Sequence, residues 1–294
     1  MADRSNSANI ELPMPPVSWI GEAQRRQFAE DGYMVIRGVV PWNLTVTAVL
    51  EIAEFAGVDL RDSHTWYSGP EENDSVVPMH HSQALWNIRQ CPELYAVFCE
   101  FWGTHQLMVD INRCYFRPPC RRDFPTRSRS GIHWDTDPRA PGPGSIQAVV
   151  LLTDVGLNAG GYQCQPDIYR NLKAWLAEHA KQPDFDFFNP GLNQHPATQI
   201  EGCAGDLIIW SSRLPHGSAA NLSAEPRFAM FVTMQPLSES MDKRRETTDC
   251  WRAKRAPPHW RGMRGQLDVE PGPPAELTEL GLHLVGAHTW DPAE

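Results

Sequence analysis

The first hundred residues show the three-to-four-residue spacing of apolar side chains that is typical of amphipathic helices. The clearest case predicts a helix over 92–102, which Gly103 ends. A shorter helix is expected over 22–30, and another should begin with Asn43 as its cap and end at Gly57. The inward face of this last helix is expected to carry Val46, Val49, Leu50 and Ala53.

From residue 107 onward, short β-prone runs bounded by turn residues replace this spacing. With one earlier run, the expected strands are 33–36, 107–116, 146–153, 206–210 and 228–234. One amphipathic helix interrupts them, with Ile168, Leu172, Trp175 and Leu176 directed inward. Many short strands with turn signals favour a mainly β protein with flanking helices, arranged as a sandwich or barrel such as the cupin-like jelly roll.

The length of 294 residues fits a single domain of this kind, 1–294. Its expected parts are a flexible arm (1–18), a helical front section (19–106), a jelly-roll core (107–236) with a helical insertion at about 166–198, and a C-terminal excursion (237–294). The excursion is basic in its first half and acidic in its second. We therefore expect a surface segment whose halves partly neutralise each other, with an anion-binding patch as the alternative.

Composition excludes several classes of function. The net charge of −10 argues against nonspecific binding to nucleic acid, which requires a positive surface. No apolar run reaches the roughly 18 residues of a membrane span, and residues 1–7 do not resemble the start of a secretory signal. The seven cysteines form no C-x-x-C pair, which indicates reduced thiols and a cytoplasmic protein.

The candidate chemistry begins at His133-Trp134-Asp135. Side chains alternate along a strand, so His133 and Asp135 should share one face while Trp134 occupies the other. An imidazole nitrogen and a carboxylate oxygen presented together form two corners of a metal site. A simple His–Asp hydrogen bond would explain this short motif equally well.

A second segment strengthens the metal hypothesis. The apolar run 206–210 leads into a turn that presents His216, and Arg227 follows at the head of the next expected strand. Two histidines and one carboxylate form the facial triad of non-haem Fe(II) oxygenases, which leaves coordination positions open. A guanidinium binds a carboxylate through two parallel hydrogen bonds, so Arg227 is suited to anchor the far end of a diacid that chelates the metal.

With these residues, the chain resembles the phytanoyl-CoA dioxygenase-like branch of the Fe(II)/2-oxoglutarate-dependent dioxygenases. The resemblance also includes 28–39 and Phe116-Arg117-Pro118-Pro119, where the family commonly has Lys before the prolines. It implies a double-stranded β-helix in which His133, Asp135 and His216 bind Fe(II). It also implies that Arg227 binds the distal carboxylate of 2-oxoglutarate. Arg117 and Asn112 are the further candidates for contact with this co-substrate.

The resemblance implies that the enzyme oxidises, and most simply hydroxylates, an unactivated C–H bond while 2-oxoglutarate and O₂ become succinate and CO₂. Related halogenases lack the carboxylate that Asp135 retains here, so halogenation is disfavoured. Where many members have Pro-Gly-Ser-His, this chain has 166–169, Pro-Asp-Ile-Tyr. We therefore expect a different pocket rim and a free small-molecule metabolite, for instance of secondary metabolism, as substrate. The candidate substrate contacts are His80, His81, Trp86 and Asp137.

Two other functions stay open at this point. One is a cupin-type metalloenzyme that does not use 2-oxoglutarate, for which Arg227 would be dispensable. The other is a non-catalytic jelly-roll binding module, which would usually have lost a metal ligand. The presence of the complete triad together with Arg227 favours the oxygenase. The sequence gives no prediction of the oligomeric state.

Overall fold

The computed structural model describes residues 18–67, 75–122, 131–140, 145–181, 183–238, 240–261 and 269–290. The predicted arm, apart from Ser18, lies outside these residues. So do residues 141–144 and the middle of the charged C-terminal segment, 262–268.

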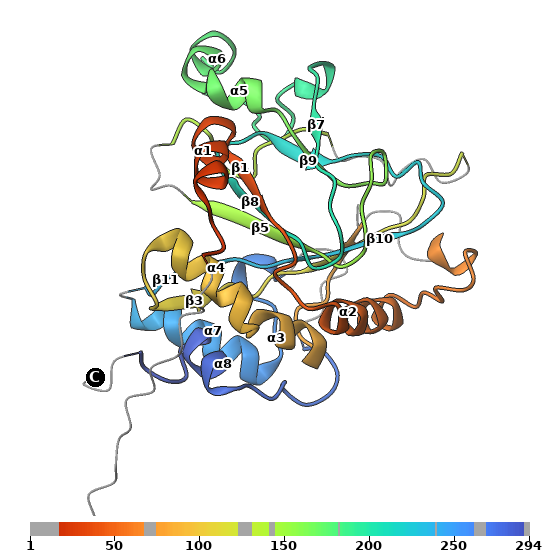
Figure 1. Ribbon diagram of the computed structural model, residues 1–294, viewed down its shortest axis with the longest axis vertical. Helices are drawn as coiled ribbons and strands as arrows, with labels where there is room; N and C mark the ends of the chain where they lie inside the picture. The colour runs from red at the N-terminus through yellow and green to blue at the C-terminus, as the bar shows by residue number, and fades with distance from the viewer. Residues whose placement is uncertain are drawn as a thin grey trace, which may run out of the picture.

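In the part of the chain that the structure describes, the strands form three antiparallel sheets (Figure 1). The large sheet has the order β1 (Tyr33–Ile36), β8 (Leu207–Ser211), β5 (Ile146–Leu151), β10 (Arg227–Phe231), β4 (Cys114–Arg117) and β2 (Val76–Val77). A smaller sheet has the order β7 (Thr198–Gln199), β6 (Tyr162–Cys164) and β9 (His216–Ser218). The third sheet pairs β11 (Met234–Pro236) with β3 (Leu107–Val109).

The large sheet is buried on both faces, which explains its nearly continuous apolar strands. Along β5, Val149 and Leu151 join a core cluster with Tyr162 and Cys164 of the small sheet. The alternate side chains of β5 belong to a second cluster that contains the helices. Two packed sheets of short antiparallel strands with flanking helices confirm the predicted fold class, a mainly β jelly roll.

The helices lie in two groups (Figure 1). The group on the side of the large sheet opposite the small sheet is α2 (Trp42–Phe55), α3 (Gln83–Arg89), α4 (Pro92–Trp102), α7 (Met241–Ala253) and α8 (Glu279–Leu284). The other group is α1 (Glu22–Asp31), α5 (Pro166–Arg170) and α6 (Leu172–His179). Short 3₁₀ turns are η1 (Thr65–Tyr67), η4 (Leu192–Gln194) and η5 (Pro258–Trp260).

The helix predictions hold where proline and glycine mark the ends. Helix α4 starts with Pro92 and ends at Gly103, whose φ of 69° suits glycine. For α2, the predicted cap is wrong: Pro41 precedes the helix, and Asn43 lies in its first turn. The predicted apolar face is also partly wrong, because Leu50 is exposed. The buried positions of α2 are instead Thr45, Ala48, Ile52 and Ala53.

Three predicted elements are each divided in two. The run 107–116 separates into β3 and β4, which pair in different sheets, and 228–234 separates likewise into β10 and β11. The chain therefore changes sheets within a continuous apolar run, and hydrophobicity alone does not mark that point. The inserted helix is also divided, at Asn171, into α5 and α6.

The prediction that the C-terminal segment is a surface excursion is partly wrong. Leu280 and Leu284 of α8, followed by Val285, are buried in the core cluster shared with the front helices. Glu270 is buried as well. The sequence interpretation followed the charged residues of this segment and therefore missed the short apolar face of α8.

All seven cysteines are free, as predicted, and no disulfide joins them. Within the described ranges, no helix has the length and apolar character needed to cross a membrane.

Candidate functional site

His133, Asp135 and His216 come together in one cluster. One potential ligand atom from each lies within 4.8 Å of the other two. The Nε2 atom of His133 is 3.4 Å from Oδ1 of Asp135, and Nε2 of His216 is 3.2 Å from Oδ2. Among the residues described, this is the one group of three or more such side chains with the spacing of a metal site.

The backbone brings the two histidines together. His216 begins β9, and His133 pairs with it as an isolated antiparallel bridge. Each residue donates its N–H to the carbonyl oxygen of the other, at 2.9 and 3.0 Å. Trp134 lies fully buried on the other face, against Trp175 of α6, as the strand alternation predicts.

The hydrogen bonds of the imidazole rings fit a cation. Nδ1 of His133 is 2.9 Å from the carbonyl oxygen of Gly131, and Nδ1 of His216 is 2.9 Å from that of Leu214. A carbonyl oxygen only accepts, so both Nδ1 atoms carry a proton, and Nε2 is the atom that each ring directs towards Asp135. A metal ion would take the place of a proton on Nε2, with each neutral ring supplying a lone pair there. A metal ion between the two rings and Asp135 satisfies all three side chains.

Asp135 is held in place from its other side. Gln147 on β5 donates to its Oδ2 at 2.6 Å, and Trp210 on β8 donates to Oε1 of Gln147 at 2.9 Å. Burial raises the pKa of Asp135, but hydrogen bonds with His133, His216 and Gln147 outweigh burial and hold that pKa well below the ordinary carboxyl range. The carboxylate is therefore ionised and oriented, as a metal ligand must be.

Arg227 is a buried cation with an unsatisfied hydrogen-bond donor. It opens β10, it is 4% exposed, and its Nη1 donates to the carbonyl oxygen of Gly160 at 2.9 Å. Its buried Nε has no acceptor, and no carboxylate of the described residues forms an ion pair with it. Burial lowers the pKa of Arg227 to about 10, so the group stays charged at neutral pH. A buried guanidinium in this state favours an anionic ligand.

Arg117 lies directly across the sheet from Arg227. Its Nη1 donates to the hydroxyl of Tyr115 at 2.7 Å, and both guanidinium groups lie near that ring. A Cβ atom on Gly160 would be 2.9 Å from Cδ of Arg117, so glycine permits this close packing. Arg117 thus lies behind Tyr115 and is not among the residues that line the adjacent cavity.

The cluster and Arg227 line one cavity of about 1180 Å³. Asn112, the other candidate for contact with the co-substrate, lines it too. Sequence reasoning missed most of its other walls, because their aromatic and polar side chains come from distant loops and strands. Those side chains include Arg113, Tyr115, Gln147, Tyr162, Phe188, Asn189, Asn193, Trp210 and Trp260.

The structure does not bring the four predicted substrate residues to this cavity. His80 and His81 are buried, and their backbone N–H groups donate to the carboxylate of Glu270 at 2.6 and 2.8 Å. Trp86 is fully buried and donates to Nδ1 of His81. Asp137 forms an ion pair with Arg139 at 2.7 Å. The pattern of histidine and tryptophan therefore marked a buried structural network.

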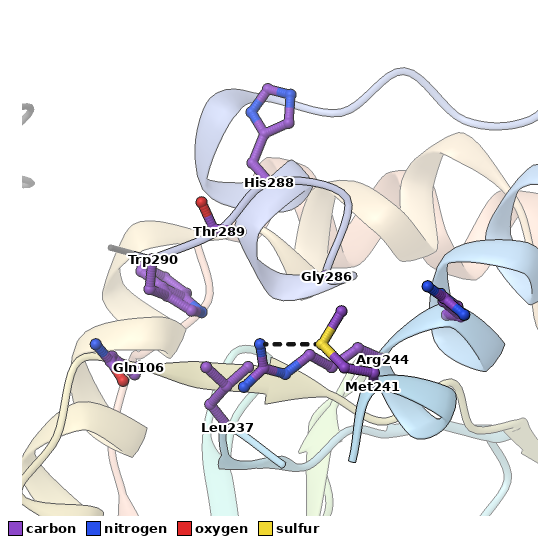
Figure 2. A pocket seen from close by; sticks show the side chains of 9 residues that line it. Gln106, Leu237, Met241, Arg244, Gly286, His288, Thr289 and Trp290 are labelled. Atoms are coloured by element: carbon purple, nitrogen blue, oxygen red, sulfur yellow. Dashed lines mark hydrogen bonds between the residues drawn. The ribbon is translucent and has the colours of Figure 1, made fainter. Parts of the chain in front are cut away.

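A second hollow lies between α7 and the loop after α8 (Figure 2). It measures about 130 Å³ and is lined by Met241, Arg244, Gly286 and His288, among others. Arg244 is already engaged there by the carbonyl oxygen of Ser238 and by Sδ of Met241. This hollow contains none of the predicted site residues.

A jelly roll that presents two histidines and one carboxylate beside a buried arginine defines a class of protein, the Fe(II)/2-oxoglutarate-dependent dioxygenases. The family described as phytanoyl-CoA dioxygenase (PhyH) matches residues 28–229, and the chain belongs to this family. The protein is accordingly a dioxygenase that uses Fe(II) and 2-oxoglutarate.

Individual relatives are distant. A "Putative phytanoyl-CoA dioxygenase" of Dictyostelium discoideum is 26% identical over 260 residues, covering 72% of this chain and 74% of that protein. "Ava biosynthesis cluster protein O" of Aspergillus versicolor is 23% identical over 267 residues, covering 81% and 85%. The solved structure of SnoK, a non-heme alpha ketoglutarate dependent carbocyclase from nogalamycin biosynthesis, has a TM-score of 0.50 and 21% identity, covering 76% of this chain and 85% of SnoK.

Proposed function

We propose that the enzyme hydroxylates an unactivated C–H bond of a small-molecule metabolite, while 2-oxoglutarate and O₂ become succinate and CO₂. His133, Asp135 and His216 hold the iron, and Arg227 binds the distal carboxylate of 2-oxoglutarate. The observation that carries the proposal is the convergence of three ligand atoms within 4.8 Å beside a cavity that Arg227 also lines.

Iron and 2-oxoglutarate, when bound, supply the oxidising power for attack on the C–H bond. The residues of the chain supply placement. The carbonyl contacts of both histidines fix their Nε2 lone pairs, and Gln147 fixes the carboxylate of Asp135. Arg227 orients the co-substrate from its far end. The aromatic walls of the cavity exclude water from the reacting carbon.

The names of similar proteins support a free metabolite as substrate. Residues 166–169, which depart from the family pattern, start the helix α5 and are not among the residues that line the cavity, so they do not bear on the substrate. Two similar proteins carry names that place them in biosynthesis, the Ava cluster protein and SnoK. We therefore assign the enzyme to the tailoring of a natural product. The name of SnoK shows that ring closure also occurs on this fold, and hydroxylation is the simplest outcome of the proposed site.

The test begins with anaerobic titration of Fe(II) into the protein with 2-oxoglutarate, followed by visible absorption. We expect the weak charge-transfer band of a chelate. His133→Ala should abolish iron binding, and Arg227→Lys should weaken 2-oxoglutarate binding by about tenfold or more while iron binding persists. His64→Ala is the matched control, because His64 is exposed and lies outside the site.

Other results would reject the proposal. Iron binding without the band, and without an effect of Arg227→Lys, would favour a cupin-type metalloenzyme that uses no 2-oxoglutarate. The absence of both iron and 2-oxoglutarate binding would favour a binding module. With the band established, succinate formation in the presence of free metabolites and of acyl-CoA thioesters tests the substrate class. Stimulation by thioesters alone would refute the assignment to free metabolites.

A further inference from the structure

The loop that follows α6 is anchored to the segment that carries His133. The carbonyl oxygen of Phe187 accepts from the N–H of Trp134 at 2.9 Å, and Oδ1 of Asn193 accepts from the N–H of Ile132 at 2.7 Å. These two bonds flank His133 in the sequence. The loop therefore occupies a fixed position beside the candidate metal site, and some of its side chains line the same cavity as the metal ligands.

Two adjacent phenylalanines of this loop have different surroundings. Phe187 packs against the apolar cluster that contains Trp134. Phe188 is 56% exposed and lines the cavity, with its ring centre 4.5 Å from that of Phe187. The backbone N–H of Phe188 donates to Oδ1 of Asp186 at 3.0 Å, which fixes the turn from which the ring projects. The loop thus holds a large apolar side chain at the cavity without burying it.

Asn193 adds a polar group to the same wall. It is exposed and lines the cavity. Because its Oδ1 accepts from Ile132, the amide nitrogen is the end that remains available, and Nδ2 has no hydrogen-bond partner among the described residues. An amide nitrogen of this kind only donates. The ligand group that suits it is an oxygen acceptor such as a ketone.

The cavity is large relative to the co-substrate. Its volume of about 1180 Å³ is above the roughly 300–1,000 Å³ of sites that hold drug-sized ligands, whereas 2-oxoglutarate is a small diacid. Most of the space is therefore left for the substrate. Aromatic side chains form much of the described wall, and beside Phe188 they are Tyr115, Tyr162, Trp210, Phe231 and Trp260. Flat rings pack against such side chains in offset or edge-to-face contacts.

We propose that this loop determines substrate specificity: Phe188 packs against a flat ring of the substrate, and Nδ2 of Asn193 donates to an oxygen substituent. The substrate is then an oxygen-bearing aromatic compound, with the reacting C–H bond elsewhere in the same molecule. The proposal rests on the proposed function, because it leaves the metal ligands and Arg227 to iron and 2-oxoglutarate. It narrows the substrate class from any free metabolite to an aromatic one.

The test uses pairs of ketones that differ in ring saturation alone: acetophenone and cyclohexyl methyl ketone, propiophenone and cyclohexyl ethyl ketone, benzophenone and dicyclohexyl ketone. Each is titrated anaerobically by calorimetry into protein loaded with Fe(II) and 2-oxoglutarate. At least one aromatic ketone should bind about threefold to tenfold more tightly than its saturated counterpart, as expected for contact between rings. The saturated ketone is the more hydrophobic member of each pair, so burial alone gives no such preference.

Three variants locate the contacts. Phe188→Leu keeps an apolar side chain without a flat face and should abolish the preference for the aromatic ketone. Asn193→Asp keeps the acceptor for Ile132 but loses the donor, so it should weaken binding of both ketones by about threefold or more. Trp42→Leu is the matched control, because Trp42 is 72% exposed at the start of α2 and does not line the cavity. The control should keep the wild-type affinities, and the Fe(II)–2-oxoglutarate absorption band should be unchanged in all three variants.

Three results would overturn the proposal. The first is wild-type protein that binds no aromatic ketone more tightly than its saturated counterpart, including the case in which neither binds. The second is an unchanged preference in Phe188→Leu or an unchanged affinity in Asn193→Asp, which would assign recognition to other walls of the cavity. The third is loss of the absorption band in either loop variant, which would show that the loop acts through the metal ligands. If the wild-type band is absent, the proposed function itself fails, and the two failures are thus distinguishable.

Discussion

Glu270 should be among the most sensitive single positions for stability. Its carboxylate accepts the backbone N–H groups of His80 and His81 at 2.6 and 2.8 Å, and Nδ1 of His80 lies 3.3 Å away. Its own backbone bonds to Lys254 through both its N–H and its carbonyl oxygen. One buried side chain thus connects the C-terminal segment to the residues that directly precede α3.

The magnitude follows from these contacts. Glu270→Ala leaves two buried N–H donors without an acceptor, and each costs about 1–3 kcal/mol. It also removes a negative charge that interacts with the fully buried Arg89. We therefore expect the free energy of unfolding to fall by about 3–5 kcal/mol. Glu270→Gln keeps one acceptor oxygen, so it should cost about half as much.

Urea denaturation followed by tryptophan fluorescence measures this loss as a shift of the midpoint at constant slope. Glu276→Ala, at a nearby exposed position, is the control and should change stability by less than about 0.5 kcal/mol. A loss below about 1 kcal/mol for Glu270→Ala would show that water or another group replaces the carboxylate. The C-terminal segment would then not depend on this contact.

Three further predictions concern the site and its support. Gln147→Leu removes the hydrogen bond to Asp135 and should weaken iron binding by about tenfold or more in the absorption titration; unchanged affinity would contradict the orienting role. Burial raises the pKa of Asp110 to about 6, so its ionised form destabilises the fold above its unfolded pKa of 3.8. Asp110→Asn should therefore stabilise the protein by about 1 kcal/mol at pH 8, after allowance for partial exposure, and hardly at all at pH 3; equal effects at both pH values would refute this. Trp134→Ala should lower the unfolding free energy by about 3–5 kcal/mol in thermal or urea unfolding, whereas Trp134→Phe should cost clearly less.

The sequence was informative where one local rule determines the outcome. Strand alternation correctly placed His133 and Asp135 on one face, with Trp134 on the other. Proline and glycine correctly marked the ends of α4. The family resemblance alone predicts that His133 and Asp135 lie beside His216. His133 and His216 are 83 residues apart, and no local rule of sequence joins them.

Residues whose role depends on tertiary packing could not be predicted. His80 and His81 resemble site residues in sequence, yet the contact that buries them comes from Glu270, about 190 residues later. Arg113 and Trp260 are remote in sequence and carry no motif, and only the fold stacks them. The type of a polar or aromatic residue thus shows which interactions it can make. The residues that contact it in the folded protein determine whether its role is structural or functional.

The reciprocal backbone pairing of His133 with His216 has a consequence for how the metal centre arises. The two imidazoles are placed by main-chain hydrogen bonds, so we expect the ligands to be assembled before any ion arrives. A shift of that pairing by one residue would turn a histidine to the opposite face, so correct strand alignment and an intact site are gained or lost together. The amide protons of these two residues therefore serve as built-in reporters. Their hydrogen exchange in the metal-free protein should be as slow as that of the neighbouring strands, and metal should slow it only slightly further.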